Sequence, residues 1–79
     1  MITAEQIRAG RALVNWSQDE LAKAAGVSRP TIKRMETKGP GVSSAGNVDA
    51  VMKALEGAGV SFVDPNGMGP GVRMREGGE

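Results

Sequence analysis

Apolar residues recur at helical spacing in four segments of the chain, and each segment is preceded by a helix-capping sequence. In the first, Thr3 and Gln6 have the spacing of a capping box, in which each side chain bonds the other residue's backbone N–H. The pattern therefore predicts a helix that starts after Thr3. Its apolar face consists of Ile7, Gly10, Leu13 and Val14.

The second segment has the sharpest start. Ser17 and Glu20 form another capping box, and Trp16 and Leu21 occupy the two positions of a hydrophobic staple. Gly26 follows the last periodic residue, and glycine readily adopts the positive φ that ends many helices. A short helix is therefore predicted between Ser17 and Gly26. Its apolar side consists of Leu21, Ala22 and Ala25.

The third segment begins near Ser28, where two helix starts are compatible with the sequence. Ser28 can be the N-cap, because Val27 and Ile32 then occupy the staple positions. Alternatively, Arg29 can be the cap and Pro30 the first helical residue, since proline disfavours helical backbone in the residue before it. The staple favours Ser28. In both cases Pro30 lies in the first turn, where its missing N–H costs little.

Glycine and proline separate the third helix from the fourth. Gly39 and Pro40 end the third helix, and the sequence GPGVSS is predicted to be a loop. The fourth helix is predicted to run from about Ser44 to about Gly57. Its apolar stripe consists of Val48, Val51, Met52 and Leu55.

The pattern changes after Gly59. The run VSFVD is β-prone, PNGMGPG is turn-forming and VRMR alternates apolar and basic residues. This arrangement predicts a β-hairpin over residues 60–75. Alternation along the strands places Val60 and Phe62 on one face, which Met74 and Val72 can share from the opposite strand.

The length of 79 residues suits one small domain. We expect residues 1–59 to form the helical domain, residues 60–75 the hairpin and residues 76–79 a frayed end. A two-stranded hairpin is marginal by itself in water, so it must pack on another surface. We expect the hairpin to contribute to a homodimer interface, by strand addition or by packing on the fourth helix of a second copy, which makes it a candidate dimerisation element.

The composition removes most kinds of catalytic site. The chain has neither Cys nor His, which excludes ordinary zinc sites and Ser-His-Asp triads. The acidic residues are scattered over different helices without the spacing of a metal site or a carboxylate pair. We therefore expect no enzymatic activity, catalytic residue, metal, cofactor or small-molecule ligand. No apolar run approaches the roughly 20 residues that span a bilayer, so we expect a cytoplasmic protein without a membrane partner.

Positive charge is concentrated in the third helix. The formal net charge is only +1, but residues 29–38 contain four cations and one anion. At 100° per residue, Ser28, Ile32, Met35 and Glu36 share one side of this helix. Arginine can bond guanine through two hydrogen bonds, and a proline ring or threonine methyl can contact thymine. The residues on and beside the opposite side of this helix are therefore predicted to read DNA bases: Arg29, Pro30, Lys33, Arg34 and Thr37.

The second and third helices, joined by a short turn at Gly26, form a helix-turn-helix unit. The stretch SQDELAKAAGVSRPTIKRME resembles the Cro/repressor-type helix-turn-helix regulators, also called the xenobiotic-response-element family. The matching residues are Ser17, Gln18, Leu21, Ala22, Gly26, Val27, Ser28, Ile32 and Glu36. The resemblance extends from about residue 3 to residue 55. It implies a mostly α fold, a small four-helix domain of the phage-repressor type, here with a short C-terminal β-hairpin where relatives often have a fifth helix.

The resemblance also implies roles for individual residues. A glutamine at position 18 contacts a DNA phosphate in the family, and a helix N-terminus favours phosphate; the alternative is a solvated side chain. Thr31 and Lys38 are further phosphate candidates. The family typically pairs the positions of Arg11 and Glu36, which we therefore expect to form a partly buried structural salt bridge rather than a ligand site.

These observations predict a sequence-specific DNA-binding transcriptional regulator. We expect a repressor that acts as a homodimer on a palindromic operator of double-stranded DNA, through a recognition helix over residues 28–38. Two alternatives remain. The chain can be an antitoxin or another protein-interaction module with secondary DNA binding, or it can retain the fold with a partner other than DNA. A disordered charged tail would favour the antitoxin, and the hairpin pattern argues against it.

Overall fold

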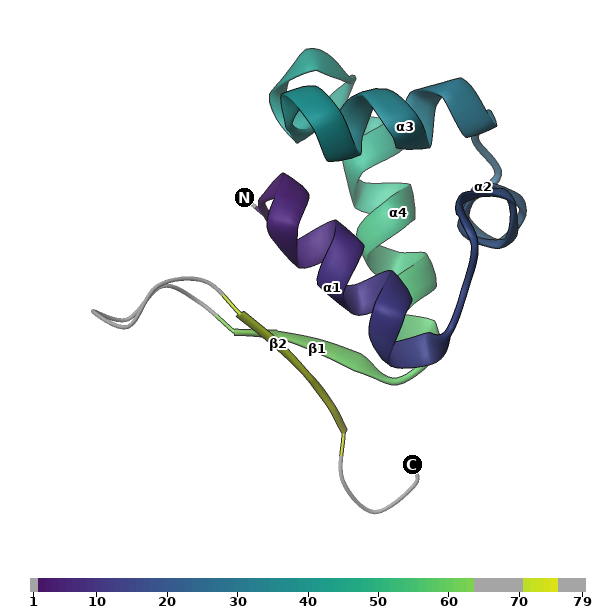
Figure 1. Ribbon diagram of the computed structural model, residues 1–79. Coiled ribbons are helices and arrows are strands. Elements are labelled where there is room, and N and C mark those ends of the chain that lie inside the picture. The colour runs from purple at the N-terminus through teal and green to yellow at the C-terminus, as the bar shows by residue number, and fades with distance from the viewer. Residues whose placement is uncertain (1, 64–70, 76–79) are drawn as a thin grey trace.

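The computed structural model describes residues 2–63 and 71–75. Four α-helices and a short 3-10 helix precede a two-stranded antiparallel sheet, which confirms the predicted mostly α fold with a C-terminal hairpin (Figure 1). The elements are α1 (Ala4–Val14), α2 (Gln18–Ala25), α3 (Arg29–Lys38), η1 (Pro40–Val42), α4 (Ala45–Gly57), β1 (Val60–Val63) and β2 (Gly71–Met74).

Local side-chain caps explain where the helices begin. The Thr3 hydroxyl accepts the backbone N–H of Gln6 at 3.1 Å, and the Gln6 side chain accepts the Thr3 N–H at 2.9 Å. Ser17 and Glu20 form the same reciprocal pair at the start of α2, at 3.0 and 2.7 Å. Both predicted capping boxes are therefore confirmed. Each satisfies two backbone groups that a helix end otherwise leaves unbonded.

Left-handed residues end α1 and α2 and set the angle of the helix-turn-helix. Gly26 has φ 71° and ψ 31°, which confirms the predicted glycine stop of α2. Asn15 ends α1 with φ 58°, a conformation that asparagine tolerates better than most residues. Beyond Gly26 the chain turns sharply, so that α2 is seen end-on in Figure 1 while α3 lies across the view.

One apolar core joins the helices and the hairpin. Gly10 allows α1 to approach α4 closely, because a Cβ at this position would lie 3.2 Å from the Leu55 side chain. The predicted burial of Leu13 is wrong: it is 43% exposed, since it lies near the end of α1, at the margin of the packed face. The buried hydrophobic residues are Ile2, Ile7, Leu21, Ala22, Ile32, Met35, Val48, Val51, Leu55 and Val60.

The connection between α3 and α4 is more regular than predicted. Gly39 ends α3 with φ 94°, but residues 40–42 form a 3-10 helix instead of an irregular loop. Pro40 is buried, and its carbonyl accepts the Ser43 N–H at 3.0 Å. Proline fits the first position of this turn because its φ is already close to the helical value.

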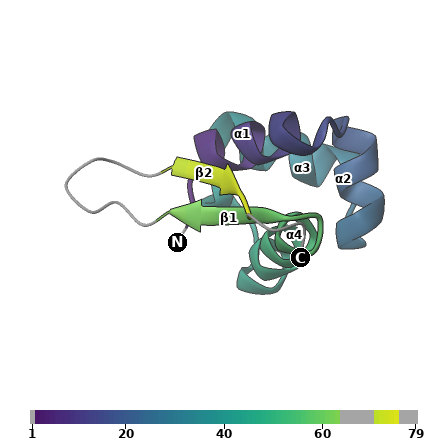
Figure 2. The same ribbon diagram turned by 90° about the horizontal axis from the view of Figure 1, so that it is seen from below.

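The hairpin packs on its own chain. Val60 pairs with Met74 and Phe62 with Val72, as the alternation predicted. Val60 is 1% exposed and lies in the core, and Phe62 and Val72 pack against it. The hairpin lies along α1, on the side of the molecule opposite α3 (Figures 1 and 2). The predicted turn over residues 65–71 lies outside the described residues except for Gly71, which begins β2, and the predicted frayed end at residues 76–79 also lies outside them.

A buried glutamine attaches the hairpin to α1. The side chain of Gln6, 5% exposed, donates to the carbonyl oxygens of Val63 at 3.3 Å and Gly71 at 2.9 Å. These bonds join the two strands at one end of their paired region. The sequence indicated only a capping role for Gln6. In the structure this side chain both caps α1 and holds the hairpin, because its oxygen accepts the Thr3 N–H while its nitrogen donates to the strand carbonyls.

Candidate nucleic-acid interface

The start of α3 follows the first of the two predicted alternatives. Ser28 is the N-cap, and its hydroxyl accepts the Thr31 backbone N–H at 3.2 Å. Arg29 is then the first helical residue and Pro30 the second. Since Pro30 has no N–H, the hydroxyl bonds the next residue along the chain. The first turn is held by this cap and by the fixed φ of the proline.

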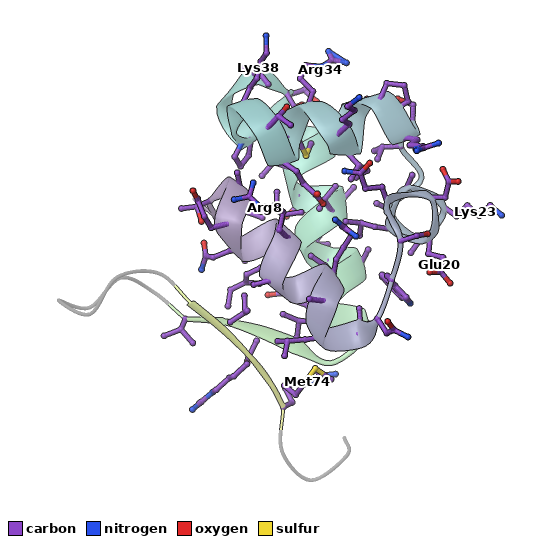
Figure 3. The ribbon with its side chains drawn as sticks, viewed as in Figure 1. Arg8, Glu20, Lys23, Arg34, Lys38 and Met74 are labelled. Carbon is purple, nitrogen blue, oxygen red and sulfur yellow. The ribbon has the colours of Figure 1, made fainter. Side chains whose placement is uncertain are left out.

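The two sides of α3 differ sharply in burial. Ile32 and Met35 are fully buried, and Glu36 is 3% exposed. The five predicted base-reading residues are all exposed, and the structure brings them together on and beside the outer face of this helix. In Figure 3 the Arg34 and Lys38 side chains project from α3 away from the rest of the molecule. The outer residues are Arg29, Pro30, Lys33, Arg34, Thr37 and Lys38.

The outer face of α3 is cationic, and in the described parts of the chain a carboxylate lies close to it only near its first turn. Among the described residues, no carboxylate lies within 4 Å of the ammonium or guanidinium nitrogens of Lys33, Arg34 or Lys38. Arg29 differs, because its Nε lies 3.6 Å from Oδ1 of Asp19 in the first turn of α2. Three cations therefore face outward without a protein counter-ion in the described parts of the chain.

Two threonine hydroxyls of α3 already have partners. Thr37 donates to the carbonyl oxygen of Lys33 at 2.9 Å, which leaves its methyl group as the outward chemical feature. The Thr31 hydroxyl lies 2.7 Å from that of Ser28. Either oxygen of this second pair can be the donor. A phosphate contact by Thr31 would therefore use a hydroxyl that also belongs to the helix cap.

Glu36 anchors α3 to the two preceding helices. The structure contains the expected salt bridge: Arg11 donates from Nε to Oε2 at 2.7 Å and from Nη2 to Oε1 at 2.9 Å. The hydrogen bonds from Arg11 to Glu36, and then the charge of the carboxylate, raise the pKa of Arg11 above its ordinary value, although burial acts in the opposite direction. Gln18 donates from Nε2 to the same Oε1 at 3.1 Å. One carboxylate thus connects α1, α2 and α3.

Two further contacts of α1 fix the geometry of the helix-turn-helix. Arg11 donates from Nη1 to the Trp16 carbonyl at 2.9 Å, which holds the turn before α2. Arg8 donates to the backbone carbonyl of Glu36, one of the last-turn carbonyls that have no partner within α3. No pattern in the sequence indicated this role for Arg8, because the contact depends on how α1 packs on α3.

The position of Gln18 is compatible with more than one role. It lies at the first position of α2, half-buried, where the helix N-terminus favours anions. Its amide donates to Glu36, but a carboxamide nitrogen carries two N–H groups. A phosphate contact by Gln18 stays a prediction.

Within the described residues, no group of three or more metal-ligating side chains is close enough together to hold a metal ion. In the same part of the chain, no helix has the length and apolar character needed to cross a bilayer.

Comparison with known proteins agrees with this geometry. The helix-turn-helix family HTH_3 matches residues 7–58, which is more than half of the 79 residues. A comparison with curated proteins finds no significant match. The matched segment includes α2, α3 and the turn between them, with most of α1 and all of α4. Assignment to the xenobiotic-response-element subdivision stays a prediction. The chain belongs to the HTH_3 helix-turn-helix family of DNA-binding regulatory proteins.

Proposed function

We propose that this protein is a sequence-specific transcriptional repressor that reads DNA with α3. The observation that carries the proposal is the outer face of α3, which presents exposed cations. The buried carboxylate of Glu36 fixes this helix to α1 and α2. An exposed cationic helix is by itself an ordinary protein surface. Its place in a helix-turn-helix, projecting from the domain, gives it the shape that enters a major groove.

The side chains on this face suit base edges. Arg29 and Arg34 can each present two parallel N–H groups to guanine O6 and N7. The Pro30 ring and the Thr37 methyl are apolar groups that can contact the thymine methyl. Lys33 adds one ammonium group, a point charge with three N–H donors. The rigid first turn reduces the entropy lost on binding, because the cap and the proline already fix the backbone there.

Phosphate contacts would set the register of the helix in the groove. Gln18 at the N-terminus of α2 and Lys38 at the end of α3 flank the proposed base-reading face. Thr31, in the first turns of α3, is the third candidate. Phosphate contacts stabilise the complex on any sequence and carry no sequence information directly.

A homodimer on a palindromic operator is the proposed assembly. Paired recognition helices need a separation near 34 Å, one turn of DNA. Because the hairpin lies opposite α3, stacking two hairpins face to face would point the recognition helices away from each other. Antiparallel pairing of strand edges places the two-fold axis perpendicular to the sheet, which keeps both α3 helices on one side. Edge pairing is therefore the geometry we propose.

The exposed apolar residues support an interface on this part of the surface. Among the described residues, the exposed large hydrophobic side chains are Leu13, Val42, Val63 and Met74. Three of these four belong to α1 and to the hairpin that packs on it. Removal of the hairpin would also remove Val60 from the core, so the oligomeric state has to be measured on the whole chain.

Selection of bound sequences from a random DNA library tests the proposal. We expect a two-fold symmetric consensus, and the Arg34→Ala and Arg29→Ala variants should each lose about 1–3 kcal/mol on it and relax one or two base positions. Equal losses on selected and random DNA would assign these arginines to phosphates instead. The absence of any enriched sequence would refute sequence-specific binding.

Two measurements test the remaining parts of the proposal. Sedimentation at high micromolar concentration should show a dimer, and a monomer with a consensus of one half-site would refute the homodimer. Transcription in vitro from a promoter that overlaps the selected site should fall when the protein is added. An increase would identify an activator.

A further inference from the structure

Arg29 is the outward cation of α3 that has an acidic neighbour among the described residues. Its Nε lies 3.6 Å from Oδ1 of Asp19, just beyond hydrogen-bond distance, and both side chains are more than 60% exposed. Asp19 lies in the first turn of α2, next to Gln18, the proposed phosphate contact. A negative charge at this place is unexpected for a surface that would approach DNA phosphates.

We propose that Asp19 determines specificity by positioning Arg29, and that it does so by favouring base contacts of this arginine over phosphate contacts. The inference rests on the proposed function, since it assigns a task to a neighbour of the proposed base-reading face. Asp19 touches no base itself. It is a positioning residue that acts through the Arg29 guanidinium.

The chemistry of the guanidinium supports the first part of the proposal. The closest approach of Asp19 to Arg29 is at Nε, and at 3.6 Å no hydrogen bond locks the guanidinium, so its terminal amino groups can still turn to form the fork that guanine accepts. A carboxylate on the Nε side also limits the rotamers of a long, exposed side chain. The entropy lost when Arg29 binds a base is thereby reduced.

Electrostatics support the second part. If Arg29 turns toward a phosphate, as on a random sequence, Asp19 remains close to the DNA backbone without its cation, and like charges repel. When Arg29 reads a guanine, the ion pair can persist and screen the carboxylate. Asp19 therefore weakens binding to random DNA more than binding to the correct site, which is specificity gained by penalising the wrong partner.

The experiment compares Asp19→Asn with the wild type on two duplexes of equal length at one salt concentration. One duplex carries the sequence selected from the random library and the other is random. We expect Asp19→Asn to bind random DNA about threefold to fivefold more tightly than the wild type, which is the range that a weak exposed ion pair allows. On selected DNA we expect its affinity to increase less than about twofold. The preference for the selected site should fall accordingly.

Glu20→Gln is the matched control. It removes the same charge from the next residue, and its amide oxygen can still accept the Ser17 N–H of the capping box. Figure 3 shows Glu20 on the side of α2 away from α3. We expect it to change binding to both duplexes by the same factor. If Asp19→Asn behaves like this control, Asp19 is only a general charge and the inference fails.

Two further results separate this inference from the proposed function. In an Arg29→Ala background, Asp19→Asn should leave the preference unchanged, and an undiminished effect there would show that Asp19 does not act through Arg29. Without DNA, Asp19→Asn should shift the NMR signal of the Arg29 Nε–H, and no shift would overturn the pairing itself.

A wild type without any sequence preference would refute the proposed function, and this inference with it.

Discussion

Replacing Arg11 by methionine should destabilise the protein more than most single substitutions. Glu36 is 3% exposed and takes two of its hydrogen bonds from Arg11, at 2.7 and 2.9 Å. Without Arg11 the carboxylate keeps only the Gln18 amide among its described side-chain donors. Removing one partner of a buried ion pair typically costs about 3–5 kcal/mol, because the remaining charge is buried and uncompensated.

A second, smaller loss adds to this cost. Arg11 also donates to the Trp16 carbonyl at 2.9 Å, and such a bond contributes about 1 kcal/mol. Small domains have total stabilities of about 5–15 kcal/mol, so Arg11→Met removes a large share. At about 4–8 °C per kcal/mol, the melting temperature should fall by more than about 12 °C.

The two partners should respond unequally. The side chain of Arg11 is 21% exposed and that of Glu36 only 3%, so an unpaired Arg11 can reach water while an unpaired Glu36 cannot. Glu36→Leu alone should therefore cost less than Arg11→Met alone. The double variant, Arg11→Met with Glu36→Leu, should recover much of the loss, since apolar replacements of a buried pair are often close to neutral.

Urea unfolding of the four proteins, wild type included, measures this coupling as a double-mutant cycle. Arg8→Met is the matched control on the same helix, because Arg8 is exposed and donates to the Glu36 backbone rather than to its carboxylate. It should cost about 1 kcal/mol or less. A double variant no more stable than Arg11→Met, or a loss for Arg11→Met as small as that for Arg8→Met, would refute the reasoning.

Three other predictions concern binding and the hairpin. Lys38→Ala should weaken DNA binding on all sequences and reduce the salt slope by about one unit, and an unchanged slope in a salt titration would remove Lys38 from the contacts. Gln18→Ala should also weaken binding on all sequences but leave the slope unchanged, because a neutral side chain releases no counter-ion. Gln6→Leu should destabilise the fold by about 1–3 kcal/mol in thermal melts, because two carbonyls of the hairpin lose a buried donor. A melting curve like that of the wild type would show that water replaces the amide.

The starts of α1 and α2, and the outer face of α3, follow from the sequence alone, whereas for the start of α3 the sequence favoured Ser28 over Arg29 as the cap and the structure selected it. Caps at Thr3, Ser17 and Ser28 are bonds between residues three apart, so they depend on the local chain and on little else. The helical period then decides which residues of α3 share a side. This is why the exposure of the predicted base-reading residues matched the expectation, while their contacts with DNA stay a proposal.

Packing between distant segments decided the rest. Gln6 bonds carbonyls 57 and 65 residues away, and Gln18 bonds a carboxylate 18 residues away. Leu13 is exposed although its place in the apolar pattern predicted burial, because a residue's burial depends on what the fold places next to it. The hairpin was predicted correctly as a local pairing, but its support by α1 was not. Local hydrogen bonds are encoded within a few residues, whereas these contacts exist only once the whole chain has folded.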